Sequence, residues 1–262
     1  MKKVYLALMC VAGFTMLTAC GGSKPEKDAA EKENQESVEE NVQASENEDA
    51  QDATDVWSDP QSVEELDMNA FYEAGDFKPG ATVIFEDNQA GEKAGELPSK
   101  WDVKSGSAEI AEAPGGKFIT MSGGDSHLFP MVNNGSKAFL PEKFMTEFQF
   151  LFGKDVWYHV VFFDAEENEV ISVNFLPTTI DWNAQKKDED WVNGNLDELD
   201  RSISKKKWNH FAVSYDSGNL KIFINGKRLA NLPNIKPVGH FLINAQDADG
   251  KSHYLKNIRV TK

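Results

Sequence analysis

The chain has 262 residues, two cysteines and a formal net charge of −16 at pH 7. Residues 21–75 carry 17 acidic and three basic residues, whereas residues 76–262 carry 26 acidic and 22 basic residues, so the acidity belongs mainly to the N-terminal part. No basic stripe is present to neutralise phosphates, which argues against a nucleic-acid partner. Two cysteines cannot form a Cys-rich metal framework, and a domain without disulfides needs a full-sized hydrophobic core.

Residues 1–19 have the features of a secretory signal. Two lysines precede an apolar run from Val4 to Leu17, which is shorter than the roughly 20 residues of a membrane span. Cys20 directly follows Leu17-Thr18-Ala19, a pattern that resembles the bacterial lipobox. The resemblance implies cleavage before Cys20 and acylation of its thiol, which would anchor the mature protein in the cell envelope, at the outer membrane. An ordinary secretory signal with an unrelated cysteine is the alternative.

Residues 20–55 are predicted to form a disordered acidic tether. No apolar side chain larger than valine occurs between Gly21 and Val56, so the segment cannot bury enough apolar surface to offset its ordering entropy. Acidic residues near a lipidated cysteine direct some Bacteroidetes lipoproteins to the cell surface. Lysines interrupt the acidic residues here, so the surface-exposed and the periplasmic leaflet both stay open.

Residues 56–75 are predicted to hold a short amphipathic helix that docks on the domain. Ser62 and Glu65 have the spacing of a capping box, in which each side chain bonds a free amide of the first turn. The helix is expected to end near Gly75. Its apolar residues fall on one face: Val63, Leu66, Ala70 and Phe71.

Residues 76–262 are predicted to form an all-β sandwich. Runs rich in Val, Ile, Phe, Trp and Tyr alternate with clusters of Gly, Asn, Asp and Pro, and Asn225-Gly226 is a strong hairpin signal. Ten or more strands without a long helix are typical of a two-sheet sandwich. Residues 176–200 are treated as irregular. The predicted strands are 82–86, 108–112, 117–121, 145–152, 156–163, 169–175, 209–215, 220–224, 227–229, 241–245 and 254–260.

Three stretches carry a recognisable pattern. Trp208 to Leu229 combines a Trp-x-His strand with an Asn-Gly-Lys hairpin, Val83 to Trp101 contains a Gly-x-Leu-Pro-x-x-Trp connection, and Leu255 to Val260 forms a closing strand. Together they resemble the concanavalin A-like or laminin-G-like jelly roll. The stretch is similar to the N-terminal domain of some Bacteroidetes envelope proteins of the outer-membrane-protein-A type, without their peptidoglycan-binding domain. Because this fold carries lectins, hydrolases and adhesion modules, the resemblance does not decide the function.

No catalytic set is recognisable, and we expect neither an enzyme nor a cofactor. Laminarinase-type hydrolases of this fold carry a Glu-x-Asp-x-Glu strand, whose carboxylates share one face. No acidic residues occur at that spacing here, and those between Asp164 and Glu169 straddle a predicted turn. The five histidines lack the paired spacing of a zinc site, and His210 is expected to be structural.

A structural calcium ion is the one metal that the resemblance suggests. Jelly rolls of this class often bind calcium through aspartate and backbone oxygens, and the ion needs about six to eight of them. No motif shows such a set, and a plain turn is the favoured interpretation. The weak candidates are Asp87, Asp247 and Asp249.

The predicted ligand site lies on the face opposite the phenylalanine-rich side of the strands. Aromatic rings beside amides and carboxylates suit sugar recognition, which predicts a lectin-like module that binds glycan on a concave face. A structural or protein-interaction subunit of an outer-membrane complex is the alternative, and a glycoside hydrolase is a third. Trp182 and Trp191 fall in the irregular segment, and core packing under a loop is the competing role for such tryptophans. The candidate residues are Trp157, Gln149, Asn174, Glu147, His159 and Trp182.

Overall fold

A computed structural model of the chain describes residues 59–132, 138–152, 156–197, 203–204, 206–247 and 252–262. The predicted signal (1–19), the acidic tether (20–55) and Cys20 lie outside the described residues. The described part contains one helix, α1 (Met68–Ala74), and thirteen strands. The strands are β1 (Val83–Asp87), β2 (Trp101–Ala113), β3 (Gly116–Pro130), β4 (Lys143–Leu151), β5 (Val156–Phe163), β6 (Glu169–Phe175), β7 (Ile180–Gln185), β8 (Trp191–Leu196), β9 (Asn209–Asp216), β10 (Asn219–Ile224), β11 (Lys227–Leu232), β12 (His240–Asp247) and β13 (His253–Thr261).

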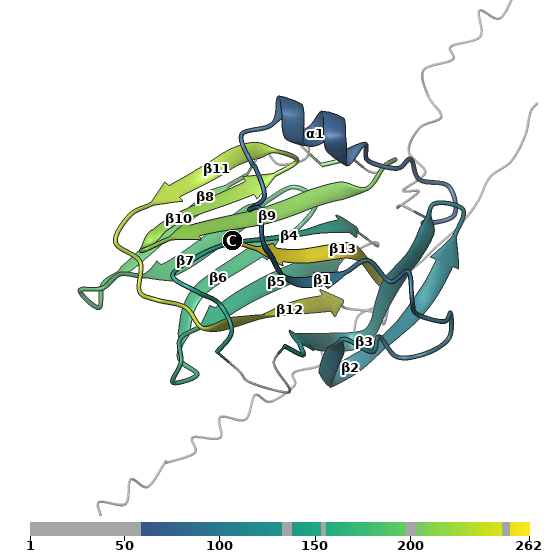
Figure 1. The fold of residues 1–262 in the computed structure, drawn as a ribbon, viewed down its shortest axis with the longest axis horizontal. Helices are drawn as coiled ribbons and strands as arrows, with labels where there is room; N and C mark the ends of the chain where they lie inside the picture. Colours follow the sequence, from purple (N-terminus) through teal and green to yellow (C-terminus); the bar gives the residue numbers. More distant parts are fainter. Residues whose placement is uncertain (1–58, 133–137, 153–155, 198–202, 205, 248–251) are drawn as a thin grey trace, which may run out of the picture. The chain divides into compact units, whose positions relative to one another are not determined.

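The strands form the two layers of a sandwich (Figure 1). We call the layer β11-β10-β9-β4-β13, with β1 paired to β13, the back sheet, and the layer β12-β5-β6-β7-β8 the front sheet. All strand pairs are antiparallel. β3 joins the layers, because residues 119–121 pair with β13 and residues 125–128 pair with β12. The sequence-based prediction of an all-β two-sheet jelly roll is confirmed.

The hairpin β2–β3 turns from one layer to the other at Gly106. The register between the two strands shifts on both sides of Ser105, so the strands bend at this point. Gly106 has φ +66°, and a Cβ atom there would lie only 2.1 Å from the Oγ atom of Ser126. Glycine is therefore required both for the left-handed backbone and for the close approach of the two strands.

Aromatic rings from both layers fill the core. Phe211 of β9 stacks on Phe175 of β6, with ring centroids 5.0 Å apart and planes 11° from parallel. Phe144 of β4 and Phe162 of β5 form a tilted pair, with ring centroids 6.0 Å apart and planes 30° from parallel. All four side chains are fully buried. The alternation of apolar with other residues along β4, β6 and β9 correctly identified the inward-facing side of these three strands.

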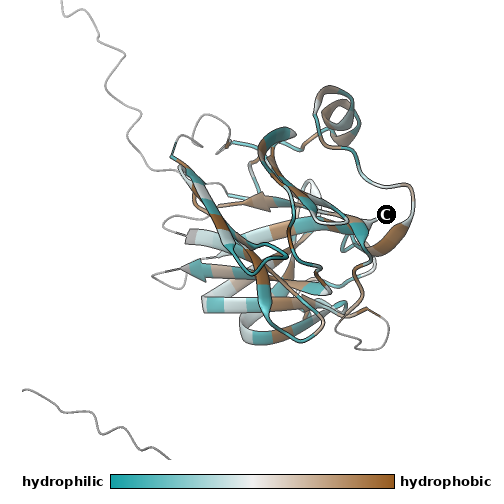
Figure 2. Ribbon diagram, turned by 90° about the vertical axis from the view of Figure 1, so that its left-hand side faces the viewer, coloured by the Kyte–Doolittle hydropathy of each residue, from teal (hydrophilic) through white to brown (hydrophobic). Residues whose placement is uncertain are grey.

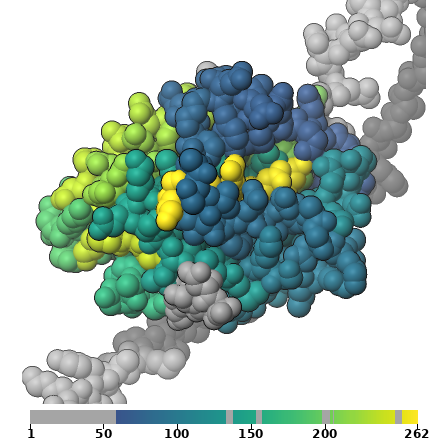
Figure 3. All heavy atoms as spheres, viewed as in Figure 1, coloured from purple at the N-terminus to yellow at the C-terminus, as the bar shows by residue number. Residues whose placement is uncertain are grey.

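The N-terminal segment, residues 59–80, covers the outer face of the back sheet. Figure 2 shows α1 nearly end-on beside the strand layers, and Figure 3 shows the dark-blue atoms of this segment lying over the face, with yellow atoms of β13 between them. Val63 and Leu66 pack against one apolar cluster, Phe118, Leu151 and Trp208. Tyr72 packs against a second cluster, Phe77, Ala212 and Phe223. The predicted docking of this segment is confirmed.

The start of the helix differs from the prediction. α1 begins at Met68, where the Oδ1 atom of Asp67 accepts hydrogen bonds from the amides of Asn69 (3.0 Å) and Ala70 (3.2 Å). The Glu65 carboxylate instead accepts a hydrogen bond of 2.7 Å from Lys256 Nζ, so the tertiary ion pair replaces the predicted capping box. The predicted end is confirmed, since Gly75 caps the helix. No helix in the described part of the chain has the length and apolarity that crossing a membrane requires.

Residues 176–200 were predicted to be irregular, and this prediction is wrong for Ile180–Gln185 and Trp191–Leu196. These two stretches form the outer hairpin of the front sheet, β7 and β8. Ile180, Trp182 and Ala184 face the core, and the residues between them face outward. This alternation has the period of a half-buried strand, but it carries too few β-branched residues to stand out from the polar residues around it.

Candidate functional site

A row of polar side chains crosses the outer face of the front sheet. Cross-strand pairing places its members side by side on successive strands, from β3 through β12, β5, β6 and β7 to β8. Alternate residues of a strand share a face, and the neighbours Val160 and Val173 point into the core, so the row points away from it. We call it the polar row: His127, Asn244, His159, Asn174, Asp181 and Asn195.

Hydrogen bonds hold several side chains of the polar row in place. Asn174 Nδ2 donates to Asp181 Oδ1 over 3.0 Å, and Asn244 Nδ2 lies 3.0 Å from His127 Nε2. Asn244 is only 5% exposed, and its Oδ1 atom is buried without a hydrogen-bond partner among the described residues. A buried acceptor without a partner costs about 1–3 kcal/mol, so a ligand hydroxyl that reached it would be favourable.

His159 occupies the middle of the polar row as a neutral group. Burial lowers its pKa below the ordinary value of 6.5, although the nearby carboxylates Glu169 and Asp181 act in the opposite direction. Its Nε2 atom lies 2.8 Å from the Ser172 hydroxyl. A neutral imidazole has one donor and one acceptor nitrogen, which suits hydroxyl groups better than ions.

Two tryptophans flank the polar row on the same face. Trp157 lies two residues before His159 on β5 and is partly exposed, and Trp191 on β8 is 47% exposed beside Gln185. They lie on opposite sides of the row. From the strand spacing and the rise per residue, we estimate a separation of roughly 25 Å. The outer face of the front sheet therefore has one flat apolar ring on each side of the polar row, with the hydrogen-bonding groups of the row between the two rings.

The structure divides the six predicted ligand residues. Trp157, His159 and Asn174 lie together on the outer face of the front sheet. Glu147 and Gln149 lie on the outer face of the back sheet, 2% and 1% exposed, beneath the N-terminal segment. The expectation that they share one face with the other three is wrong, because alternation shows only that a residue points away from the core, not which sheet it belongs to. Ligand binding by any of these residues stays a prediction.

Trp182 faces the core rather than the solvent. Its side chain is 8% exposed and belongs to the main hydrophobic cluster. The ring packs against the backbone of β8 at Gly194, where an added Cβ atom would lie 2.3 Å from the Cζ2 atom. The alternative that a tryptophan of this segment fills the core therefore holds for Trp182, while Trp191 on the partner strand points outward.

The proposed calcium ligand Asp87 already has protein partners. Its buried carboxylate accepts hydrogen bonds from Trp101 Nε1 (2.7 Å) and from the backbone N–H of Gln89 (3.1 Å). Asp249 and the side chain of Asp247 lie outside the described residues. Across the residues that the structure describes, no group of three or more His, Cys, Asp or Glu side chains is placed to hold a metal ion. The Asp87 carboxylate therefore positions the Trp101 ring.

Several residues of this face were missed by the sequence interpretation. Asp181 and Asn195 belong to the segment that was treated as irregular, and Trp191 was noted there but not chosen as a ligand residue. His127 and Asn244 carry no local signal, since an isolated histidine and an isolated asparagine in a strand are common surface residues. The alternation in β7 is the one pattern that would have placed Asp181 outside and Trp182 inside.

Comparisons with known proteins indicate only a general likeness. No known protein family matches the chain, and no curated protein matches it. Among solved structures, the receptor-binding domain of botulinum neurotoxin D is 11% identical with a TM-score of 0.49, over 69% of this chain and 49% of that one. A botulinum neurotoxin D ligand-binding domain in complex with N-acetylneuraminic acid is 12% identical with a TM-score of 0.48, over 69% and 47%.

A third likeness is to the carbohydrate-binding module CBM66 from Bacillus subtilis, which is 15% identical with a TM-score of 0.44, over 62% of this chain and 96% of that one. The chain spans about half the length of the neurotoxin domains that it matches. At these TM-scores and identities the likenesses do not bear on the ligand of this chain.

Proposed function

We propose that this protein is a lectin-like binding module, and that its ligand is a glycan lying across the polar row between Trp157 and Trp191. The observation that supports this is the polar row itself. Hydrogen-bonding side chains from six neighbouring strands face outward between two outward-facing tryptophan rings. Hydroxyl groups of a sugar both donate and accept hydrogen bonds, and its apolar face packs on aromatic rings.

Binding rather than hydrolysis fits the chemistry of this face. A glycosidase of the usual kind needs a pair of carboxyl groups that flank the scissile bond. The polar row itself contains one carboxylate, Asp181, which accepts a hydrogen bond from Asn174 over 3.0 Å. The carboxylate of Asp125 lies 3.1 Å from His127 Nε2, but it belongs to β3, four strands from Asp181, and at about 4.8 Å per strand this is too far for the two to act as a pair. We therefore propose no catalytic role for the polar row.

The membrane anchor belongs to the same proposal. The lipobox-like Leu17-Thr18-Ala19-Cys20 supports a lipid on Cys20, and the acidic tether of residues 20–55 would hold the module away from the outer membrane. Incorporation of labelled palmitate into the wild type but not into a Cys20→Ser variant would support the anchor. Equal labelling of both would contradict it.

The glycan proposal is tested on the full-length mature protein in detergent. A glycan array identifies a ligand, and calorimetry compares the wild type with Trp191→Ala. We expect about tenfold weaker binding, since the loss of the aromatic packing at one end of the glycan removes roughly 1.4 kcal/mol. Leu97→Ala is the control, because Leu97 is an exposed apolar residue of the β1–β2 connection, at 68% exposure.

Two results would oppose the proposal. Absence of binding to every glycan on the array would contradict it, and so would equal affinity of the wild type and Trp191→Ala for a glycan that does bind. Recovery of one envelope protein by crosslinking, without any glycan binding, would favour a structural or protein-interaction role instead.

A further inference from the structure

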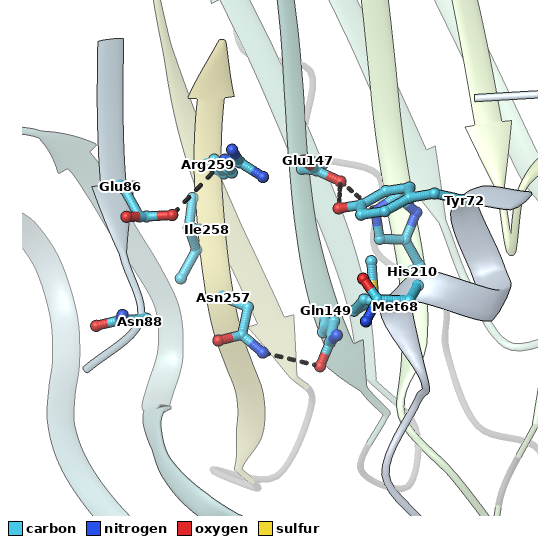
Figure 4. Close-up of a pocket in the computed structure, with 11 residues that line it drawn as sticks. Met68, Tyr72, Glu86, Asn88, Glu147, Gln149, His210, Asn257, Ile258 and Arg259 are labelled. Carbon is cyan, nitrogen blue, oxygen red and sulfur yellow. Dashed lines mark hydrogen bonds and ion pairs between the residues drawn. The ribbon is translucent and has the colours of Figure 1, made fainter. Parts of the chain in front are cut away.

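A pocket of about 380 Å³ lies on the opposite side of the sandwich from the polar row, between α1 and the outer face of the back sheet (Figure 4). Small-molecule sites commonly have volumes of about 300–1,000 Å³. Residues from α1, β1, β4, β9 and β13 line the pocket, so the helix and the sheet enclose it together. The residues that matter for its chemistry are Tyr72, Glu86, Glu147, Gln149, His210 and Arg259.

Glu147 is the most buried charged group in this pocket. Its Oε2 atom accepts a hydrogen bond of 2.6 Å from the Tyr72 hydroxyl and lies 2.8 Å from His210 Nε2. Its Oε1 atom is buried and has no hydrogen-bond partner among the described residues, and the same is true of His210 Nδ1. Both side chains are at most 3% exposed. The pocket therefore contains two buried polar atoms whose hydrogen-bonding capacity is unused, which is costly unless something binds there.

The remaining groups of the pocket are close to charge balance. Arg259 Nε lies 3.6 Å from Glu86 Oε1, and it too lacks a hydrogen-bond partner among the described residues. Asn257 Nδ2 donates to Gln149 Oε1 over 3.2 Å, which leaves the Gln149 amide nitrogen available. An anionic ligand would meet the carboxylates of Glu86 and Glu147, and a cationic ligand would meet the Arg259 guanidinium. A neutral ligand with several hydroxyl groups meets neither penalty, because each hydroxyl can donate and accept.

We propose that this pocket is a second binding site, and that it takes a neutral, hydroxyl-rich group of the size of one sugar residue. The Glu147 Oε1 atom accepts one ligand hydroxyl, His210 Nδ1 bonds a second, and Arg259 donates to a third oxygen. This site shares no residue with the polar row and does not depend on the function proposed for it. Its ligand would contact α1 and the back sheet at once, because Tyr72 and Asn69 belong to the helix.

The test is ligand-observed saturation-transfer NMR on the full-length mature protein. The neutral probes are glucose, galactose, mannose, xylose and N-acetylglucosamine, and the charged probes are glucuronate and glucosamine. Glu147→Gln keeps the shape of the side chain and an oxygen for the Tyr72 hydroxyl, but removes the charged acceptor. We expect about tenfold weaker binding of a neutral probe, the loss of one hydrogen bond to a charged group.

Two further variants make the result interpretable. Asn69→Ala alters an exposed pocket residue whose side chain makes no hydrogen bond with the residues that the structure describes, so this variant keeps the test valid if Glu147→Gln unfolds. It should weaken binding several-fold. Trp191→Ala alters the polar-row face alone and should bind the neutral probe like the wild type.

The outcomes separate this site from the polar row. A neutral probe that binds the wild type and Trp191→Ala equally, but binds Glu147→Gln or Asn69→Ala more weakly, would support the pocket. Loss of binding in Trp191→Ala with normal binding in the two pocket variants would overturn the pocket and leave the polar row as the site. Binding of charged probes alone, or of no probe at all, would also overturn this inference.

Discussion

The Tyr72 hydroxyl is predicted to be a main attachment of α1 to the sandwich, and Tyr72→Phe tests this. The hydroxyl donates to Glu147 Oε2 over 2.6 Å, and Glu147 is buried. A hydrogen bond to a charged group contributes about 1.5–3 kcal/mol, and phenylalanine keeps the ring packing on Phe77. A loss of about 2 kcal/mol corresponds to a fall in Tm of about 4–8 °C for a domain of this size.

A double-mutant cycle shows whether this loss comes from the bond to Glu147. Thermal and urea unfolding would be measured for the wild type, Tyr72→Phe, Glu147→Gln and the double variant. We expect a coupling energy of about 1 kcal/mol or more between the two positions, since residues in one hydrogen-bond network are not additive. Additive effects, or a Tm of Tyr72→Phe equal to that of the wild type, would refute the reasoning.

The same bond predicts a dependence on alkaline pH. Burial and then the Glu147 charge raise the pKa of Tyr72 above its ordinary value of 10.0. The folded state therefore keeps this proton where the unfolded state loses it, so the stabilisation is complete below pH 10 and is lost as the pH rises above it. Tyr72→Phe should lose less stability than the wild type between pH 9 and pH 11. A parallel loss in both proteins would argue against the raised pKa.

The core and the polar row lead to three further predictions, two on substitutions and one on pH dependence. Gly194→Ala should lower the free energy of unfolding in urea by about 1–3 kcal/mol, because the new Cβ atom would overlap the Trp182 ring. Gly91→Ala is the control and should leave this free energy unchanged, because nothing lies within 4 Å of the added Cβ atom. Equal stability of the two variants would contradict the packing of Trp182 on Gly194. Trp101→Phe should cost about 1–3 kcal/mol by leaving the buried Asp87 carboxylate without its 2.7 Å donor, and an unchanged Tm would count against that role. Because burial lowers the pKa of His159, its contribution to stability is present above pH 6.5 and is lost as the pH falls below it; an NMR titration that gave a pKa above 6.5 would be incompatible with this.

Most strands could be predicted from local patterns. β5 and β6 have the predicted bounds, and most of the others differ by a few residues at their ends. Alternation along β4, β6 and β9 also identified the core residues, because a strand that is half buried must repeat its apolar residues with period two. The hairpin at Asn225-Gly226 was predictable for a local reason as well, since both residues have positive φ.

The helix start and the outer hairpin were not predictable in the same way. Ser62 and Glu65 satisfy the spacing of a capping box, but the ion pair of Glu65 with Lys256 joins residues 191 positions apart in the chain. β7 and β8 carry few β-branched residues and are held by sheet pairing, β7 with β6 and β8 with β7. A contact between distant parts of the chain decided the helix start, and sheet pairing between consecutive strands decided the outer hairpin. Local propensity reports neither.

The sequence by itself determined the all-β class, the position of most strands and the inward-facing side of β4, β6 and β9. Only the tertiary structure decided where the outward-facing residues meet. It places Trp157, His159 and Asn174 on one outer face and Glu147 and Gln149 on the other, beneath α1. The physical reason is that alternation is a property of one strand, whereas a shared surface depends on which strands pair and on what covers them.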